Sequence, residues 1–304
     1  ELDIPKPVYN LEISGGSHGE MTGRMLEAIE RVLMAEQPDW VLVYGDTNST
    51  LAGALAAAKL HIPIGHVEAG LRSFNLRMPE EINRILSDHT STLLFAPTNA
   101  AFKNLINEGF KPENSPPYNV NNPKIYLTGD IMYDNSLFFA SLSQKKKSPL
   151  LKTLSADNDR FILVTIHRDI NTDDIHRLRA ILSTLKIMAE EYSMPFVMPF
   201  HPRTTNILKK HLKDLYDELL SCGFIRIIPP VSYLEMILLE MSCRLIITDS
   251  VGVQKESHFF RKPCVVLRKE TEWIELITNG TARLVDADPV LIKKEFTSFM
   301  HSDS

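Results

Sequence analysis

Cysteine is scarce in this chain of 304 residues, and the three present, Cys222, Cys243 and Cys264, stand far apart without a CxxC pair. A disulfide framework or a cysteine zinc site needs more closely and regularly spaced cysteines. We therefore expect no structural disulfide and no metal centre. Free thiols of this kind favour a reducing, cytoplasmic location.

An excess of basic residues and a long apolar run are also lacking. Lys and Arg total 33 against 38 Asp and Glu, which gives a net charge of −5. This balance carries no electrostatic signature of nucleic-acid or anionic-membrane binding. No apolar run reaches the roughly 18 residues that span a bilayer, and the N-terminal sequence has no signal-peptide pattern. The sequence therefore predicts no nucleic-acid partner and no membrane association.

Short apolar runs alternate with stretches that suit helices. Four runs lie within residues 40–129, "WVLVYG", "IPIGHV", "TLLFAP" and "KIYLTG", and five within residues 161–268, "FILVTI", "PFVMPF", "FIRIIP", "RLIITD" and "PCVVLR". This βαβ rhythm is typical of parallel sheets covered by helices. We predict an α/β protein of two Rossmann-like doubly wound domains facing a cleft, an N-terminal domain over residues 1–145 and a C-terminal domain over residues 146–304.

The beginning of the chain differs from the usual opening of such a domain. The first residue is Glu1, and the first strong strand pattern starts only at residue 40, after the helix-like stretch "HGEMTGRMLEAIERVLMAEQ". A doubly wound domain normally opens with a strand and a tight βα turn. We therefore expect the first strands of the N-terminal domain to be missing from this chain.

Polar side chains that directly follow the strands are the first candidates for a site, because ligands of doubly wound sheets collect at the carboxyl ends of the strands. In "YGDTNSTLAGALAAAK", Asp46 follows the first run, and Asn48, Ser49 or Thr50 can cap an alanine-rich helix. Asp46 is either part of this turn or an acid or base projecting into the cleft.

The most charged stretch is "HVEAGLRSFNLRMPEEINR" at residues 66–84. Glu68 leaves the second run, and Pro79 with Glu80 opens a helix, where acidic residues also suit the helix dipole. Arg84 lies four residues after Glu80, so the two are expected on one helix face, with the arginine holding the carboxylate ionised. Carboxylates in different environments are a means of separating an acid from a base.

The second domain offers groups suited to a diphosphate. "TIHRD" and "PFHPRT" place His167, Arg168, His201 and Arg203 at strand ends, although such basic pairs are also common surface features. "TDSVGVQKE" predicts a strand, a turn and a helix. Its Ser250 and Gly252, with the free N–H groups of the first turn, favour phosphate binding, and Ser250 also suits the role of N-cap.

Taken together, these segments closely resemble the non-hydrolysing UDP-N-acetylglucosamine 2-epimerases, whose architecture is shared with GT-B glycosyltransferases. The resemblance covers nearly the whole chain in order and rests on "GDTNST", "HVEAGLRS", "PEEINR", "FAPT", "TIHR", "TDSVGVQKE" and "RKETEW". It implies reversible elimination of UDP, which forms a 2-acetamidoglucal, and re-addition of UDP after a proton has returned to C2 on the other face. No cofactor is implied.

By the matching motifs, the acid and base candidates are Asp46, Glu68, Glu80 and His167. UDP-sugar binding is expected from Arg84, Arg168, His201, Ser250, Val251, Gly252 and Glu256. Tyr233 and Met236 in "PVSYLEMILLE" lie where the family places its uracil-packing segment. A homodimer and a role in polysaccharide precursor synthesis are also implied by the resemblance.

Some positions depart from the family pattern. Val251 replaces the first of two glycines, Ile170 stands where "HRxEN" has Glu, and Trp273 stands where "TERPE" has Arg. The "TEW" form resembles the branch that acts on modified UDP-sugars, so the exact UDP-2-acetamido sugar stays open. Two alternatives are a GT-B UDP-sugar glycosyltransferase and an inactive UDP-sugar-binding fragment.

Overall fold

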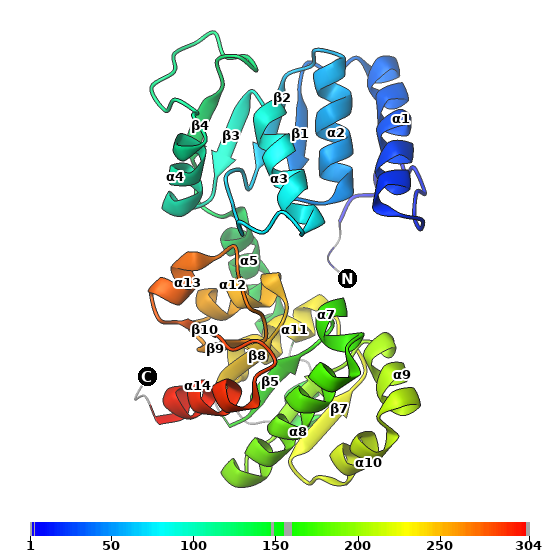
Figure 1. Ribbon diagram of the computed structural model, residues 1–304, viewed down its shortest axis with the longest axis vertical. Helices are drawn as coiled ribbons and strands as arrows, with labels where there is room; N and C mark the ends of the chain where they lie inside the picture. Colours follow the sequence, from blue (N-terminus) through cyan, green and yellow to red (C-terminus); the bar gives the residue numbers. More distant parts are fainter. Residues whose placement is uncertain (1, 3, 147–148, 155–159, 302–304) are drawn as a thin grey trace. The chain divides into compact units, whose positions relative to one another are not determined.

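The computed structural model describes residues 2, 4–146, 149–154 and 160–301. The chain forms two compact units, Glu1–Ile131 and Met132–Ser304 (Figure 1). This division falls earlier than the predicted domain boundary at residues 145 and 146. The reason lies in helix α5 (Ile131–Lys146), which packs within the second unit: Ser143 Oγ donates to the backbone oxygen of Leu234, and the Phe139 ring contacts that of Tyr233.

The first unit is a parallel four-stranded sheet with strand order β1-β2-β3-β4. Its elements are α1 (His18–Glu36), β1 (Val41–Tyr44), α2 (Asn48–Lys59), β2 (Ile64–Val67), α3 (Pro79–Thr90), β3 (Leu93–Ala96), α4 (Asn99–Asn107) and β4 (Lys124–Leu127). Pro79 occupies the first turn of α3, as predicted. Because all four strands are parallel, their carboxyl ends lie at one edge of the sheet.

The two faces of this sheet differ in exposure. Val43 and Ile64 point to one face and belong to an apolar cluster with Leu33 of α1 and the alanines of α2. On β1, Leu42 and Tyr44 point the other way, and they are 51% and 60% exposed. This second face, which we call the open sheet face, also carries Tyr126, aligned with Tyr44 by the strand register.

The second unit is a six-stranded parallel sheet flanked by helices (Figure 1). After α5, its elements are α6 (Leu150–Thr153), β5 (Ile162–Thr165), α7 (Asp169–Thr172), α8 (Ile175–Tyr192), β6 (Phe196–Pro199), α9 (Pro202–His211), α10 (Lys213–Ser221), β7 (Ile225–Ile228), α11 (Tyr233–Ser242), β8 (Leu245–Thr248), α12 (Val251–Phe259), β9 (Cys264–Val266), α13 (Ile274–Thr278), β10 (Ala282–Leu284) and α14 (Pro289–His301).

The strand order β10-β9-β8-β5-β6-β7 is that of a doubly wound sheet. Strands β5, β6 and β8 are fully buried, and α8, α10 and α14 pack on them through one apolar cluster. Strands β6 and β7 lie on one side of β5, and β8, β9 and β10 lie on the other, so the strand order reverses between β5 and its parallel neighbour β8. This is the topological switch point, where such sheets bind ligands. The α/β fold with two Rossmann-like units is confirmed.

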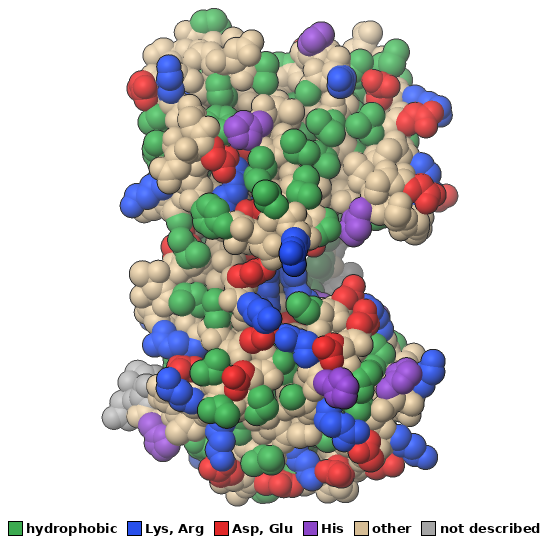
Figure 2. Space-filling model, viewed as in Figure 1, with side chains coloured by type: hydrophobic (Ala, Val, Ile, Leu, Met, Phe, Trp, Pro, Cys, Tyr) green, Lys and Arg blue, Asp and Glu red, His purple; other side chains and the backbone are tan. Residues whose placement is uncertain are grey.

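Charges of both signs are interspersed on the surface. On the face that Figure 2 shows, Lys and Arg side chains alternate with Asp and Glu side chains over both units. Within the described residues, no helix is both long enough and apolar enough to cross a membrane. The three cysteines are buried as free thiols.

Candidate active site

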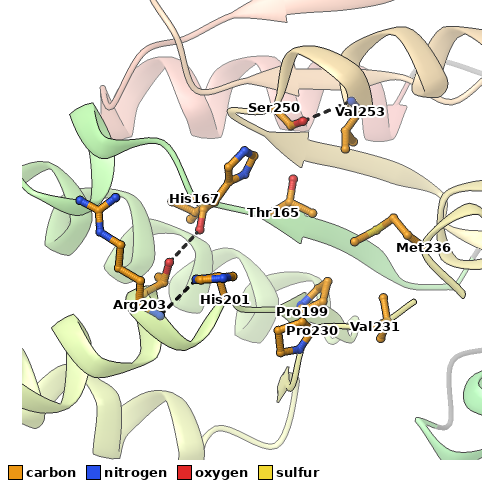
Figure 3. A pocket seen from close by; sticks show the side chains of 12 residues that line it. Thr165, His167, Pro199, His201, Arg203, Pro230, Val231, Met236, Ser250 and Val253 are labelled. Carbon is orange, nitrogen blue, oxygen red and sulfur yellow. Dashed lines mark hydrogen bonds between the residues drawn. The ribbon is translucent and has the colours of Figure 1, made fainter. Parts of the chain in front are cut away.

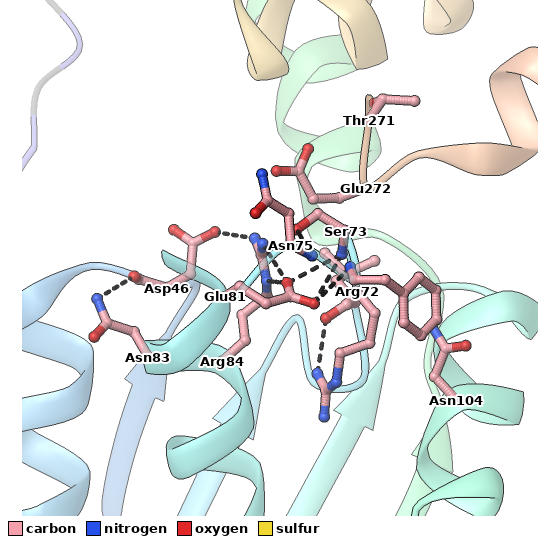
Figure 4. A network of polar contacts seen from close by, with 12 residues as sticks. Asp46, Arg72, Ser73, Asn75, Glu81, Asn83, Arg84, Asn104, Thr271 and Glu272 are labelled. Carbon is pink, nitrogen blue, oxygen red and sulfur yellow. Dashed lines mark hydrogen bonds and ion pairs between the residues drawn. The ribbon is translucent and has the colours of Figure 1, made fainter. Parts of the chain in front are cut away.

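The turn that carries Asp46 is held by helix α3. Gly45 has a φ of +66°, which glycine adopts without steric cost. Asn83 Nδ2 donates to the backbone oxygen of Asp46 at 2.8 Å, and Arg84 Nη1 donates to Asp46 Oδ2 at 2.5 Å (Figure 4). The cap of α2 is Thr47, not one of the three residues that follow it, because Thr47 and Thr50 form a reciprocal capping box.

The predicted pairing of Arg84 with Glu80 is replaced by pairings with Asp46 and with Glu81, three residues before the arginine. Glu81 is buried, accepts from Arg84 Nη2 at 2.7 Å, and accepts from the backbone N–H groups of Ser73 and Phe74. Glu80 is only partly buried. Glu81 is therefore the residue that fastens the loop after Glu68 to α3 (Figure 4).

Glu68 lies beside the turn of Asp46. Its φ of +71° is unusual for a residue with a side chain. Glu68 Oε2 lies 3.6 Å from the point where a Cβ on Gly45 would stand. Two residues later, a Cβ on Gly70 would lie 2.3 Å from the backbone oxygen of Ala101, so only glycine fits there. The structure thus brings two of the predicted acid and base candidates together.

A buried network of charges lies beneath these two turns. His66 contacts Asp88, Asp88 contacts Arg72, and Arg72 contacts Glu108. Burial lowers the pKa of His66, but the Asp88 carboxylate and the backbone oxygen of Gly45 together raise it more, so the net direction is upward. Burial raises the pKa of Asp88, and the neighbouring His66 and Arg72 lower it below its ordinary value. The network therefore favours the charged forms of both partners.

In the second unit, Asp249 fastens the turn that carries His167 and Arg168. The Asp249 carboxylate is fully buried and accepts from the backbone N–H groups of His167 and Arg168 and from Asn171 Nδ2, all within 3.0–3.2 Å. His167 Nδ1 also lies 3.3 Å from Asp249 Oδ1, while the imidazole is half exposed. One carboxylate at the end of β8 thus orients the segment after β5.

A cavity of about 390 Å³ opens at the switch point of this sheet (Figure 3). Four of the predicted site residues line it: His167, His201, Met236 and Ser250. The other lining residues are Thr165, Ile166, Pro199, Arg203, Thr204, Pro230, Val231 and Val253. Its size and mixed apolar and polar lining suit a small-molecule ligand.

Polar groups converge on this cavity from three strand ends. Ser250 caps α12, and its Oγ accepts from the backbone N–H of Val253 at 3.4 Å. The first N–H groups of α12, including those of Val251 and Gly252, have no acceptor within the helix and are suited to an anion. His201 caps α9, and its Nδ1 accepts from the N–H of Arg203. Arg203 in turn pairs with Asp169 and Asp173.

Glu256 lies on α12 within a cluster of buried acidic groups. Tyr233 Oη donates to Glu256 Oε1 at 2.9 Å, so Tyr233 contacts Glu256 and Phe139, whereas Met236 lines the cavity. Glu240 is fully buried beside Glu256. Burial and the Glu256 carboxylate raise the pKa of Glu240 well above its ordinary value, and burial raises that of Glu256. The raised pKa favours the neutral, protonated form of Glu240, whose two carboxyl oxygens are buried without a hydrogen-bond partner among the described residues.

Sequence reasoning assigned no role to Glu81, Asp249 or Glu240. Glu81 and Asp249 adjoin predicted residues, so their positions carried a signal, but Glu240 lies in the apolar stretch "MILLEMS" and carried none. Within the residues that the structure describes, no group of three or more His, Cys, Asp or Glu side chains could hold a metal ion.

The chain resembles known proteins over most of its length. The chain is 52% identical over 287 residues to the UDP-2,3-diacetamido-2,3-dideoxy-D-glucuronate 2-epimerase of Pseudomonas aeruginosa, covering 94% of this chain and 75% of the relative. It is 45% identical over 298 residues to the UDP-N-acetylglucosamine 2-epimerase of Methanocaldococcus jannaschii, covering 96% of this chain and 77% of the relative.

A solved structure shares the fold. The crystal structure of the M. jannaschii UDP-GlcNAc 2-epimerase in complex with UDP-GlcNAc and UDP has a TM-score of 0.86 and 42% identity, covering 99% of this chain and 80% of the other. The family model described as UDP-N-acetylglucosamine 2-epimerase matches residues 1–304. The motifs, the two Rossmann-like units and these matches confirm the predicted family, and the chain belongs to the UDP-N-acetylglucosamine 2-epimerases.

Proposed function

We propose that this chain is a non-hydrolysing UDP-sugar 2-epimerase that interconverts UDP-N-acetylglucosamine and UDP-N-acetylmannosamine or a related pair of UDP-2-acetamido sugars. The observation that carries the proposal is the cavity at the switch point of the second sheet, which joins the N-terminus of α12 to His167 and His201. A relative whose structure contains UDP-GlcNAc and UDP shares this fold at 42% identity.

In this proposal the second unit holds UDP. The diphosphate is bound by the N-terminus of α12, through Ser250 Oγ and the N–H groups of Val251 and Gly252, because a helix N-terminus favours an anion. Arg168 and His201 supply further donors. The uracil packs on Met236, and Glu256 accepts from the ribose hydroxyls while Tyr233 fixes its carboxylate.

The first unit supplies the carboxylates for proton transfer. A base among Asp46, Glu68 and Glu80 removes the proton from C2, the C1–O bond breaks, and UDP leaves with the bonding electron pair. The product is the 2-acetamidoglucal. Addition then returns a proton to C2 on the opposite face and UDP to C1, so the atoms balance without a redox step. Arg84 keeps Asp46 in place, and His167 serves as a further acid or base.

The test is proton NMR of UDP-N-acetylglucosamine in deuterated water with the purified chain. We expect deuterium at C2 together with signals of UDP-N-acetylmannosamine. Free N-acetylmannosamine and UDP would instead indicate a hydrolysing enzyme. Transfer only after an acceptor is added would indicate a glycosyltransferase, and UDP binding without exchange of any UDP-sugar would indicate an inactive binding fragment.

Substitution of the three carboxylates tests their assignment. Asp46→Asn, Glu68→Gln and Glu80→Gln are each expected to lower the exchange rate at C2 by about 100-fold or more, the range for positioned acids and bases. UDP affinity, measured by calorimetry, should stay within a few-fold because UDP is assigned to the second unit. The matched control is Glu113→Gln, an exposed carboxylate of the first unit. Retained exchange in all three variants would overturn the proposed chemistry.

A second candidate substrate is a UDP-2,3-diacetamido-2,3-dideoxyglucuronate, because the P. aeruginosa relative that is 52% identical is an epimerase of that sugar. The sequence feature that favours this substrate is Trp273 in the "TEW" form, which resembles the branch that acts on modified UDP-sugars. Trp273 is buried, and the Lys255 ammonium lies 4.1 Å from the centre of its ring. A kcat/KM for the diacetamido sugar that exceeds the value for UDP-N-acetylglucosamine would identify the modified sugar as the substrate.

We also propose that the enzyme is a cytoplasmic homodimer that supplies polysaccharide precursors. The family resemblance supports the homodimer and the precursor role, and the free thiols support the cytoplasmic location. Light scattering of the purified chain would decide the oligomeric state.

A further inference from the structure

Both ring nitrogens of His66 face oxygen acceptors. Nδ1 lies 2.7 Å from Asp88 Oδ1, and Nε2 lies 2.8 Å from the backbone oxygen of Gly45. The side chain has no exposed surface. A backbone oxygen only accepts hydrogen bonds, so Nε2 must carry a proton.

The protonation of Nδ1 follows from the other contacts of Asp88. Oδ2 of this carboxylate accepts from the backbone N–H of Gly70 at 3.1 Å and lies 2.7 Å from Arg72 Nη2. A carboxylate with these donors is ionised, which leaves the proton between Oδ1 and Nδ1 on the imidazole. His66 is therefore an imidazolium, a buried cation held by a buried anion.

This pair connects the two turns that carry candidate acid and base groups. His66 holds the oxygen of Gly45, the residue before Asp46, and Asp88 holds the N–H of Gly70, two residues after Glu68. Glu68 Oε2 in turn lies against Gly45. We propose that the His66 imidazolium and Asp88 form a positioning pair that sets Asp46 and Glu68 relative to one another for proton transfer at C2. The inference rests on the proposed epimerase function.

The charges around the pair set the expected pH dependence. Arg72 adjoins Asp88 and pairs on its other side with Glu108, and Asp46 and Glu68 adjoin the Gly45 side. Since the pKa of His66 in the folded chain is raised, its contribution is complete below the ordinary histidine value and is lost as the pH rises through the folded value. Positioning of the two carboxylates, and with it turnover, should therefore decline on the alkaline side.

The first experiment needs no turnover. Long-range proton–nitrogen NMR of the chain labelled with ¹⁵N should show one histidine, absent from His66→Gln, that keeps protons on both nitrogens at pH 7.5. Backbone amide signals of Asp46 and Gly70 should shift together with its titration at higher pH. A neutral His66 at pH 7.5, or amides of Asp46 and Gly70 that ignore its titration, would overturn the inference.

The second experiment uses C2 exchange. Asp88→Asn keeps hydrogen-bonding groups but removes the charge, so the alkaline decline of kcat should move to lower pH by about 1–3 units. His66→Gln should lower kcat by up to about 100-fold, as misplaced catalytic groups do, with KM changed only a few-fold. Glu108→Gln is the matched control, because it alters the same network without contacting His66, and its alkaline limb should match the wild type.

Unchanged alkaline limbs in both Asp88→Asn and Glu108→Gln would assign the pair a structural role only and contradict the inference. If the wild-type chain exchanges neither UDP-N-acetylglucosamine nor the diacetamido sugar, the proposed function has failed. The NMR experiment then decides the state of His66 and its coupling to the two turns separately.

Discussion

Glu240 illustrates at the scale of a single residue what burial does when a second carboxyl group lies beside it. The side chain is fully buried, and Tyr233 and Glu256 are its acidic neighbours. A buried carboxylate without a cation is costly, so the group keeps its proton. A protonated Glu240 also does not repel the neighbouring Glu256 carboxylate, which lowers the cost of burying the two groups side by side.

This state predicts how stability depends on pH. Because the pKa of Glu240 is raised on folding, its contribution is complete below about pH 4.3, the unfolded value, and is lost as the pH rises through the folded value. Glu240→Gln mimics the neutral acid, so its free energy of unfolding should fall less between pH 5 and 8 and exceed the wild-type value at pH 8 by at least about 1 kcal/mol.

Urea unfolding of both proteins across this pH range measures the difference. Asp217→Asn, an exposed acid of α10, is the control and should follow the wild-type curve. A wild-type pH dependence in Glu240→Gln would mean that Glu240 is ionised in the folded protein.

The site residues show where sequence patterns suffice at this scale. Ser250, His201 and His167 follow strand ends, and that position alone predicted that they would gather at one edge of the sheet. Glu80 and Glu81 were not separable, because both suit the first turn of a helix and only the backbone of the loop decides which one accepts from Ser73 and Phe74. The partner of Arg84 was mispredicted for this reason.

At the scale of helices, two serine caps allow a matched comparison. Ser250 caps α12 at the cavity, whereas Ser232 caps α11 with a capping box and does not line the cavity. Both Ser250→Ala and Ser232→Ala should lower the free energy of unfolding by about 1 kcal/mol. Only Ser250→Ala should also weaken UDP binding, by about 5- to 10-fold, because it removes a hydrogen-bonding group from the proposed diphosphate site. Denaturant unfolding and calorimetry measure the two effects, and equal UDP affinities in the two variants would contradict the proposed role of α12.

The strands were predicted well because buried parallel strands are almost continuously apolar. All the apolar runs form β1 to β9, each within a residue or two of the expected bounds. The edge strand β10 was missed, since its three residues, Ala282 to Leu284, include Arg283 and make too short a run. The predicted domain boundary lies later in the chain than the division between the two units, because the sequence of α5 does not reveal which unit this helix packs on. Residues 147–148 and 155–159, which follow the predicted boundary, lie outside the described residues.

The open sheet face has a consequence for the whole molecule. Leu42, Tyr44 and Tyr126 are exposed on one face of a parallel sheet, a class of sheet that normally buries both faces. The folded chain should therefore bind the dye ANS, and the double variant Leu42→Ser, Tyr44→Ser should lower the fluorescence at least about 2-fold, since such patches attract apolar ligands. Leu220→Ser, which removes an exposed leucine from α10, is the control. Equal fluorescence in all three proteins would show that this face does not bind the dye.

The pairing of β5 with β8 also determines when the proposed UDP site can form. Asp249, which accepts from the backbone N–H groups of His167 and Arg168, follows His167 by 82 residues and Arg168 by 81. A ribosome adds about 5–20 residues per second, so a nascent chain displays this segment for several seconds, on the order of 10 s, before its anchor has been synthesised. Until then β5 has no β8 to pair with. Because the proposed site is incomplete at that stage, a nucleotide cannot assist folding by binding to it. The proposed site is completed only after Asp249 has been synthesised. Premature termination before Asp249 would therefore yield a chain that retains His167 and His201 but lacks the carboxylate that orients His167.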